Sequence, residues 1–278
     1  MERGVPIRSI SRCIAVLQAI NRRGSLSLME VARATALPYP TACRVIQTLI
    51  VEGLIELEPV RKHYRATALV QSLSSGFCDN GRLLAEARPR IVELTGQVGW
   101  PVAVVTHVGP SMMVRDSTHT LTSLTFNNCM PGFTLPIVEC ASGHVHLAYA
   151  EEMERQTIID TLERQDGPSD MLTMLKTGLF ARRIRDDGYA TRDRNPHTAN
   201  PGKTSSISVP VFDQGRVAAA LTLVFFSSAM PMAEAVKRHA QALRACAQNI
   251  SAALCGEVAF GAAPMLPATS HARQALAA

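Results

Sequence analysis

Residues 37–66 have the sequence LPYPTACRVIQTLIVEGLIELEPVRKHYRA. This sequence is compatible with few folds of the surrounding chain. The two prolines stop one helix and open another, because the residue before a proline avoids the α region and proline suits the first turn of a helix. Apolar residues then recur at helical spacing until Gly53, where we expect the helix to end. Residues 54–58 and 63–67 predict the two strands of a β-hairpin with a basic turn. The residues expected to face inward from the helix are Ala42, Val45, Ile46 and Leu49.

Two further helices precede this stretch. Apolar residues at helical spacing predict a helix over residues 9–21, capped by Ser9 or Ser11. Ser27 followed by Glu30 is typical of a capping box that opens a second, short helix. Three helices followed by a β-hairpin predict a winged helix-turn-helix.

The charge of the chain is concentrated in this N-terminal part. Residues 1–70 contain ten Lys and Arg and five Asp and Glu, whereas residues 71–278 contain eighteen of each kind, so the whole excess of +5 lies in the first quarter. Such asymmetry indicates a polyanionic partner for one part of the chain only. The alternative is a solvated basic surface without a partner.

A winged helix-turn-helix binds double-stranded DNA by placing its third helix in the major groove, with outward side chains near base edges. The hairpin then lies along phosphates or reaches a minor groove. The alternative is a three-helix module that contacts another protein. The candidate DNA-binding residues are Tyr39, Thr41, Arg44, Gln47 and Thr48 on the helix and Arg61, Lys62 and His63 at the hairpin tip.

The rest of the chain predicts a second, mixed α and β part. Its pattern is helical over residues 68–97, with interruptions expected at Gly76, Gly81 and Pro89. Strands are expected at 100–109, 111–117, 121–126, 189–193, 205–213 and 216–226, with Asp213, Gln214 and Gly215 as the turn between the last two. Helices are expected at 139–150, 151–162, 171–188 and 232–254, and the last 22 residues are expected to be disordered.

Compartment and membrane class follow from the cysteines and the apolar runs. The seven cysteines are scattered and form no C-x-x-C pair, which favours buried thiols in a reducing compartment over disulfides or a zinc ribbon. The longest apolar run, residues 218–226, is far shorter than the roughly 18–20 residues that span a bilayer. We therefore expect a cytoplasmic protein with no membrane partner.

Several motifs of the chain resemble the IclR family of bacterial transcription regulators. They are LPYPTACRVIQTLIVEGLIE with KHYRAT in the first part, and LPIVECASGHVHLAYA, DDGYATRD and SSISVPVFDQGRVAAALTLV in the second. The likeness covers about residues 5–255. Within the family, GWPVAVVTH, SMMVRDSTH and LVFFSSAM look most like activators of 3-(3-hydroxyphenyl)propionate catabolism.

The resemblance implies an α+β protein in four parts. These are a winged helix-turn-helix over residues 1–70, a linker helix and dimerisation element over 71–95, a GAF-like effector domain with a curved antiparallel sheet over 96–256, and a disordered tail over 257–278. It further implies a homodimer or homotetramer on operator DNA and a small organic acid as effector. We expect the effector to be an aromatic carboxylic acid and RNA polymerase to be a further partner.

The resemblance also places an effector pocket between the sheet and the helix in ECASGHVH. Such pockets are mostly apolar, with a few polar groups that orient the ligand. The alternative for each candidate is core packing, and Arg115 is a further residue that could pair with a carboxylate. Residues 189–205 are longer than the family pattern, and Thr222 and Val224 stand where some relatives have two serines. The candidates are Met112, Val114, Ala141, Ser142, His144, Leu147, Asp193, Ser206, Ser208 and Thr222.

Catalytic and cofactor motifs are weak. Cys140 with Ser142 and His144 suggests a nucleophile and base, but no G-x-S-x-G elbow is present. His144 and His146 lack the i, i+4 spacing of metal-binding helices, and no phosphate-binding loop is present. We expect no enzyme activity, no metal and no cofactor. The hypotheses left open are a ligand-responsive regulator, a metabolic enzyme with a vestigial DNA-binding module, and a DNA-binding protein without an effector.

Overall fold

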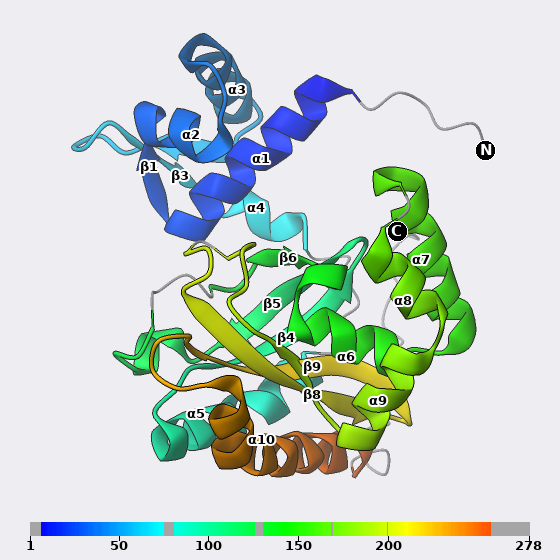
Figure 1. The fold of residues 1–278 in the computed structure, drawn as a ribbon. Coiled ribbons are helices and arrows are strands. Elements are labelled where there is room, and N and C mark those ends of the chain that lie inside the picture. The colour runs from blue at the N-terminus through cyan, green and yellow to red at the C-terminus, as the bar shows by residue number, and fades with distance from the viewer. Residues whose placement is uncertain (1–6, 75–80, 126–129, 168, 199, 257–278) are drawn as a thin grey trace, which may run out of the picture.

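The N-terminal part, drawn in blue to cyan in Figure 1, folds as three helices and a three-stranded sheet. The computed structural model describes residues 7–74, 81–125, 130–167, 169–198 and 200–256, so the tail predicted over 257–278 lies outside the described residues. The order of the elements confirms the winged helix-turn-helix. They are α1(Arg8–Arg23), β1(Ser25–Ser27), α2(Leu28–Thr35), α3(Tyr39–Val51), β2(Ile55–Leu57) and β3(His63–Ala66).

The helix ends of this part follow the predicted signals, with one exception. Ser27 caps α2 through the predicted capping box, in which its side chain accepts the Glu30 N–H and the Glu30 carboxylate accepts the Ser27 N–H. The cap predicted for α1 at Ser9 or Ser11 is wrong, because α1 begins one turn earlier and Ile7 is its N-cap residue without a side-chain hydrogen bond. A strand that we did not expect, β1, pairs with β3 and extends the hairpin to the order β1-β3-β2.

The segment between the two parts contains two helices, α4(Leu69–Ser72) and α5(Arg82–Val98). The predicted linker helix over 71–95 therefore overlaps α5, whose residues Ala87, Ile91 and Leu94 belong to the core of the second part. Pro89 lies inside α5, so the predicted interruption there is wrong. Burial of the apolar face outweighs the roughly 3 kcal/mol that an internal proline costs a helix.

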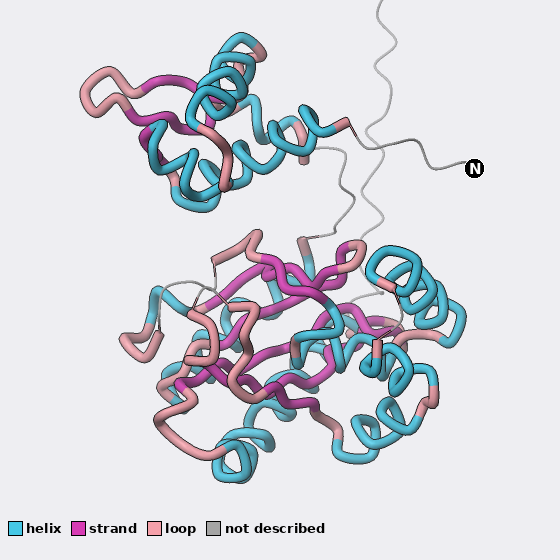
Figure 2. Tube along the Cα trace, turned by 45° about the horizontal axis from the view of Figure 1, so that its top comes forward, coloured by secondary structure: helices cyan, strands magenta, loops and turns pink. Residues whose placement is uncertain are grey.

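The second part is built on one six-stranded antiparallel sheet with the order β6-β5-β4-β9-β8-β7. Helices α5 and α10 cover one face, and α6 to α9 lie against the other (Figures 1 and 2). The turn at Gln214 and Gly215, both at positive φ, joins β8 and β9 as predicted. The strands are β4(Val102–Val108), β5(Ser111–Ser117), β6(Thr134–Pro136), β7(Ala190–Arg192), β8(Thr204–Asp213) and β9(Arg216–Phe226).

The strand predicted over residues 121–126 is wrong within its described part. After β5 the chain turns into a 3-10 helix, η1(His119–Leu121), and residues 122–125 form no strand. The cause is the fully buried Thr118, whose hydroxyl lies 2.6 Å from that of Thr95 and accepts the Val102 N–H at 2.9 Å. These bonds end the ladder between β4 and β5 and direct the chain away from the sheet.

Helices complete the second part: η2(Ile137–Glu139), α6(Ala141–Tyr149), α7(Glu152–Asp166), α8(Asp170–Lys176), α9(Leu179–Asp187) and α10(Met232–Cys255). The single helix predicted over 171–188 is divided into α8 and α9, because Gly178 adopts φ +70° and begins a new helix. Within the described residues, no helix is both long and apolar enough to cross a bilayer.

Candidate nucleic-acid interface and effector pocket

Helix α3 presents the predicted DNA-binding side chains on its outer face. Its buried residues are the four predicted from spacing, and they pack against α1 and α2. Tyr39, Arg44, Gln47 and Thr48 are exposed, and Thr41 is half-buried. The Thr48 hydroxyl donates to the Arg44 carbonyl at 3.0 Å, so it is partly committed within the helix. The face therefore offers a guanidinium, an amide and a phenol together, as base-edge recognition requires.

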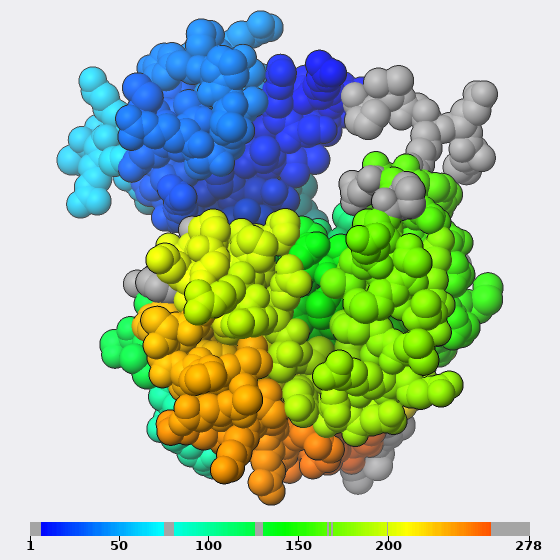
Figure 3. All heavy atoms as spheres, viewed as in Figure 1, coloured from blue at the N-terminus to red at the C-terminus, as the bar shows by residue number. Residues whose placement is uncertain are grey.

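The wing carries two of its three predicted cations at the tip. Arg61 and Lys62 are exposed, and Lys62 makes the turn at φ +51°. His63 lies in β3 instead, with Nε2 3.5 Å from a carboxylate oxygen of Glu30, so its ring is directed toward α2. Figure 3 shows the tip as a cyan projection from the N-terminal part. The tip thus presents two exposed cationic side chains.

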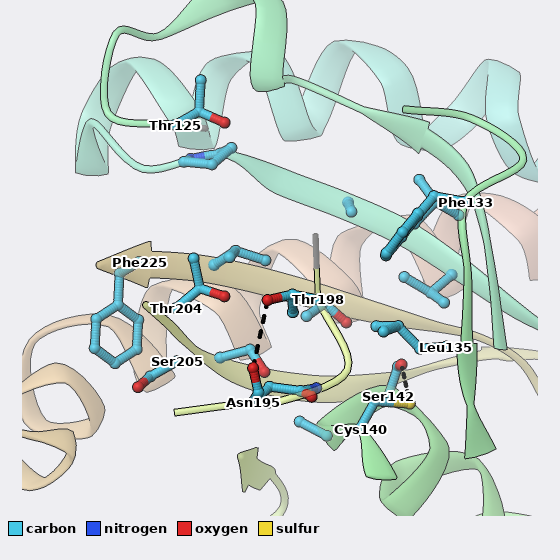
Figure 4. Close-up of a pocket in the computed structure, with 18 of the residues that line it drawn as sticks. Thr125, Phe133, Leu135, Cys140, Ser142, Asn195, Thr198, Thr204, Ser205 and Phe225 are labelled. Carbon is cyan, nitrogen blue, oxygen red and sulfur yellow. Dashed lines mark hydrogen bonds between the residues drawn. The ribbon is translucent and has the colours of Figure 1, made fainter. Parts of the chain in front are cut away.

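A pocket opens on the face of the sheet that α6 covers (Figure 4). Its empty volume is about 860 Å³, including the mouth that is open to solvent. Strands β4, β5, β8 and β9 form the floor, and the first residues of α6 form one wall. The residues that line it and were predicted are Met112, Val114, Ala141, Ser142, Ser206 and Thr222.

Four predicted residues do not line the pocket. His144 and Leu147 lie further along α6 and are both buried, with Leu147 in a core cluster shared by β4, β5, α7 and α8. His144 Nε2 is 2.8 Å from the Val138 carbonyl oxygen, and its ring packs edge-on against Phe180. Asp193 is exposed and accepts a hydrogen bond from Ser205.

The fourth is Ser208, which is fully buried on the same face of the sheet as Ser206 and Thr222 but outside the pocket. Its hydroxyl lies 2.9 Å from that of Thr222, which does line the pocket. Ser208 therefore restricts the rotamer of Thr222 and has no direct access to a ligand.

Other lining residues were missed from the sequence. Phe133 and Leu135 come from β6 and the loop before it, and Asn195, Thr198 and Asn200 come from the long segment before β8. Asn195 holds this segment in place, because its Nδ2 donates to the Glu139 carbonyl at 3.0 Å and its Oδ1 accepts the His197 N–H at 2.8 Å. The unusual length of residues 189–205 was the available signal, but no periodicity marks these side chains.

The wall of the pocket combines backbone N–H groups with a nearby ion pair, Arg192 and Glu139, whose charges act on Cys140. None of the described residues that line the pocket has a charged side chain. Helix α6 begins at its wall, and no side chain caps the first turn. The first N–H groups of a helix lack intrahelical partners and carry partial positive charge, so this end of α6 favours an anion.

Cys140 and Ser142 at this wall do not form a nucleophile. Burial raises the pKa of the Cys140 thiol to about 11, so it is protonated at neutral pH. The Ser142 hydroxyl donates to Cys140 Sγ at 3.3 Å, and His144 is turned away toward Val138. The arrangement lacks the base that activates a serine or cysteine.

The chain matches two family models that together span most of its length. The model "IclR helix-turn-helix domain" matches residues 9–59, and "Bacterial transcriptional regulator IclR C-terminal" matches residues 77–252. Among curated proteins, it is 24% identical over 151 residues to the probable transcriptional regulator SauR of Cupriavidus necator, a match that covers 54% of this chain and 59% of that protein.

Solved structures share the fold. An IclR transcriptional regulator from Alicyclobacillus acidocaldarius has a TM-score of 0.61 and 20% identity, covering 90% of this chain and 100% of that one. An IclR homologue from Microbacterium hydrocarbonoxydans, solved with 4-hydroxybenzoate, has a TM-score of 0.61 and 22% identity over 88% of this chain and 98% of that one. A regulator from Brucella abortus has a TM-score of 0.59 and 22% identity, covering 89% and 93%.

Proposed function

Because the chain belongs to the IclR family of bacterial transcriptional regulators, which bind DNA and small-molecule effectors, we propose that its effector is an aromatic carboxylic acid and that it controls genes of aromatic acid catabolism. The observation that carries the proposal is the pocket, which joins an apolar floor to an uncapped helix N-terminus. The related regulator solved with 4-hydroxybenzoate supports the same class of ligand.

The two ends of such a ligand suit opposite parts of the pocket. The ring lies against Met112, Val114, Phe133 and Leu135, which are apolar, and Met112 can adapt its shape to the ring. The carboxylate takes the N–H groups at the start of α6, since the described lining offers no Lys, Arg or His to pair with it. Hydroxyl groups of the ring meet Thr198, Ser206 or Thr222. A substituted phenylpropionate or hydroxybenzoate satisfies all three requirements.

In the N-terminal part, we propose that α3 reads bases through Thr41, Arg44 and Gln47 while Arg61 and Lys62 contact phosphates. The exposure of these side chains supports the proposal. The protein acts as a homodimer or homotetramer, and RNA polymerase is a further partner if DNA binding activates transcription.

Isothermal titration tests the effector. We expect 4-hydroxybenzoate and 3-(3-hydroxyphenyl)propionate to bind, and their uncharged amides to bind at least about tenfold more weakly, because the amides lose the charge-assisted contact with α6. Ser206→Phe, which fills the pocket from its floor, should abolish binding, whereas Lys62→Ala should retain it. Ser206 is only partly buried, so a phenylalanine there can fill the pocket without disrupting the fold. Ser142, which also lines the pocket, is almost fully buried and is less suitable for a large side chain.

Two outcomes separate the parts of the proposal. If the wild type binds no aromatic acid at millimolar concentration but binds a small keto acid such as pyruvate, the aromatic assignment is wrong and the regulator assignment stands. If the acids and their amides bind equally, the contact between the carboxylate and α6 is wrong. Gel-shift measurements of promoter DNA binding, with and without the acid, then distinguish a regulator whose DNA affinity depends on the effector from a protein whose DNA affinity does not.

A further inference from the structure

A group of three possible metal ligands lies between β4, α6 and α7, further along α6 than the residues that line the pocket. His107 is near the end of β4, His146 is in the middle of α6, and Glu154 is in the first turn of α7. One donor atom from each side chain lies within 4.8 Å of the other two. The two imidazole rings are stacked, with their centroids 4.5 Å apart and their planes inclined by 26°. Three elements that are distant in sequence thus direct nitrogen and oxygen donors to one place.

His146 has an unmet bonding requirement at this place. Its side chain is 8% exposed, and its Nε2 atom is buried without a hydrogen-bond partner. The Oε1 atom of Glu154 lies 3.3 Å from it, and the His107 imidazole is stacked on its ring. Buried polar atoms are normally paired, so an orphaned nitrogen beside a carboxylate and another imidazole indicates a missing bonding partner.

The hydrogen bonding of His107 also suits a cation. His107 Nε2 lies 2.6 Å from the Gly109 carbonyl oxygen, which only accepts, so Nε2 carries the proton and Nδ1 keeps the lone pair. A ligating histidine usually donates its other N–H to a carbonyl or carboxylate in this way.

From these three observations we propose that His107, His146 and Glu154 bind a divalent transition-metal ion, with Zn²⁺ as the expected occupant. Two imidazoles and one carboxylate are a donor set that zinc uses with a fourth, open position. Hard cations such as Mg²⁺ and Ca²⁺ prefer oxygen ligands only, so they do not fit. Closing the donors around an ion, with bonds of roughly 2.0–2.2 Å, requires two movements. The His107 ring must turn out of its stack with His146 so that the two lone pairs converge, and the half-exposed Glu154 side chain must rotate.

The ion would connect α7 to α6 and β4. Helix α6 carries the wall of the effector pocket at its N-terminus and His146 about one turn beyond Ser142. The ion therefore stabilises the domain that contains the pocket, and the site itself is independent of which effector the pocket binds.

Cobalt titration tests the site in the tag-free, full-length protein after treatment with a chelator and removal of the chelator. We expect one Co²⁺ per chain, with the intense visible d–d bands of four-coordinate cobalt and no near-ultraviolet band from a thiolate ligand. Zn²⁺ should displace it and raise the melting temperature in proportion to the logarithm of its concentration. Such a result supports a nitrogen and oxygen site.

Two variants locate the site, and a third is the matched control. Glu154→Gln removes an exposed ligand, and His107→Phe removes a ligand but keeps an aromatic ring beside His146. Each variant should weaken Zn²⁺ binding at least about 100-fold. Loss of a residue that only hydrogen-bonds to a metal ligand typically weakens binding about 10–100-fold. His197→Asn removes another surface histidine, whose Nε2 lies 3.6 Å from a Glu139 oxygen, and should leave binding unchanged. Fluorescence of Trp100, the single tryptophan, checks that each variant is folded. Equal affinity in all four proteins, a thiolate band, or no saturable binding would overturn the proposal.

Discussion

Gly143, in the first turn of α6, illustrates how one residue holds the pocket wall in place. A Cβ atom built on it would lie 1.8 Å from the Ile137 carbonyl oxygen and 2.6 Å from the Ile137 carbonyl carbon, both backbone atoms that cannot rotate away. We expect Gly143→Ala to lower the free energy of unfolding of this domain by about 1–3 kcal/mol, because α6 must separate from η2. Urea denaturation followed by Trp100 fluorescence measures the change, since Trp100 is buried in the core of the same domain.

Gly96 provides the matched control for this prediction. It lies in α5, is exposed, and a Cβ there meets nothing within 4 Å. Gly96→Ala should therefore raise the free energy of unfolding by up to about 1 kcal/mol, through helix propensity alone. If both alanine variants change stability in the same direction, the steric account of Gly143 is wrong.

At the scale of elements, α3 and the wing should divide DNA recognition between them. Arg44→Ala should cost about 1–3 kcal/mol for the specific operator if Arg44 reads a guanine, with little change for random DNA. Lys62→Ala should weaken binding to all sequences alike and reduce the slope of log affinity against log salt by about one unit. Fluorescence anisotropy over a series of salt concentrations measures both effects.

Lys237→Ala is the control for the charge removed in Lys62→Ala. Lys237 is an exposed lysine of α10 in the other domain, so its replacement should leave both the DNA affinity and the salt slope unchanged. Operator affinity that stays the same in the Arg44 and Lys62 variants would remove α3 and the wing from the DNA interface.

The short helix η1 should make stability depend on pH. Burial, together with the Arg88 guanidinium, lowers the pKa of His119 in the folded state below its ordinary value of 6.5. Below about pH 6.5 the unfolded chain therefore takes up a proton that the folded chain refuses, so folding stability decreases as the pH falls. Urea unfolding at pH 7.5 and pH 5.5 should show this loss, and His119→Asn should reduce it. His197→Asn, at an exposed histidine, should keep the full wild-type loss. A reduction as large as that in His119→Asn would indicate a cause other than burial.

At the scale of the whole molecule, we expect a dimer. One winged helix reads too few base pairs to define a genomic site, and two copies double the recognised sequence. Helix α1 leaves Ile10 and Ile14 more than half exposed, and α4 and the turn after it add Leu69 and Leu73, so apolar surface is available beside the DNA-binding face. Sedimentation at micromolar concentration should show a dimer or tetramer.

Substitution of this apolar surface tests the same prediction. The double variant Ile10→Glu, Ile14→Glu should sediment as a smaller species and bind operator DNA at least about tenfold more weakly, because it loses the second half-site. Met153→Glu, at an exposed apolar residue of α7, is the control and should behave as the wild type. A monomer in the wild-type protein, with and without DNA, would contradict the prediction.

The sequence by itself determined the elements whose signals are local. The capping box at Ser27, the four inward residues of α3 and the turn at Gln214 and Gly215 depend on neighbours a few positions away, so spacing and turn chemistry sufficed for them. The same reasoning failed where a tertiary contact overruled a local preference. Pro89 stays inside α5 because the apolar face of that helix is buried, and the buried Thr118 hydroxyl ends β5 and prevents the strand expected after it.

Only the tertiary structure decided which side chains share a site. Six of the ten predicted pocket residues line the pocket, but periodicity along α6 does not reveal that only the first residues of the helix line it. Asn195 reaches the pocket from the long segment before β8, and His107 meets His146 only because β4 lies against α6. Such contacts depend on strand register and helix direction, which arise when distant segments pack and which no local pattern encodes.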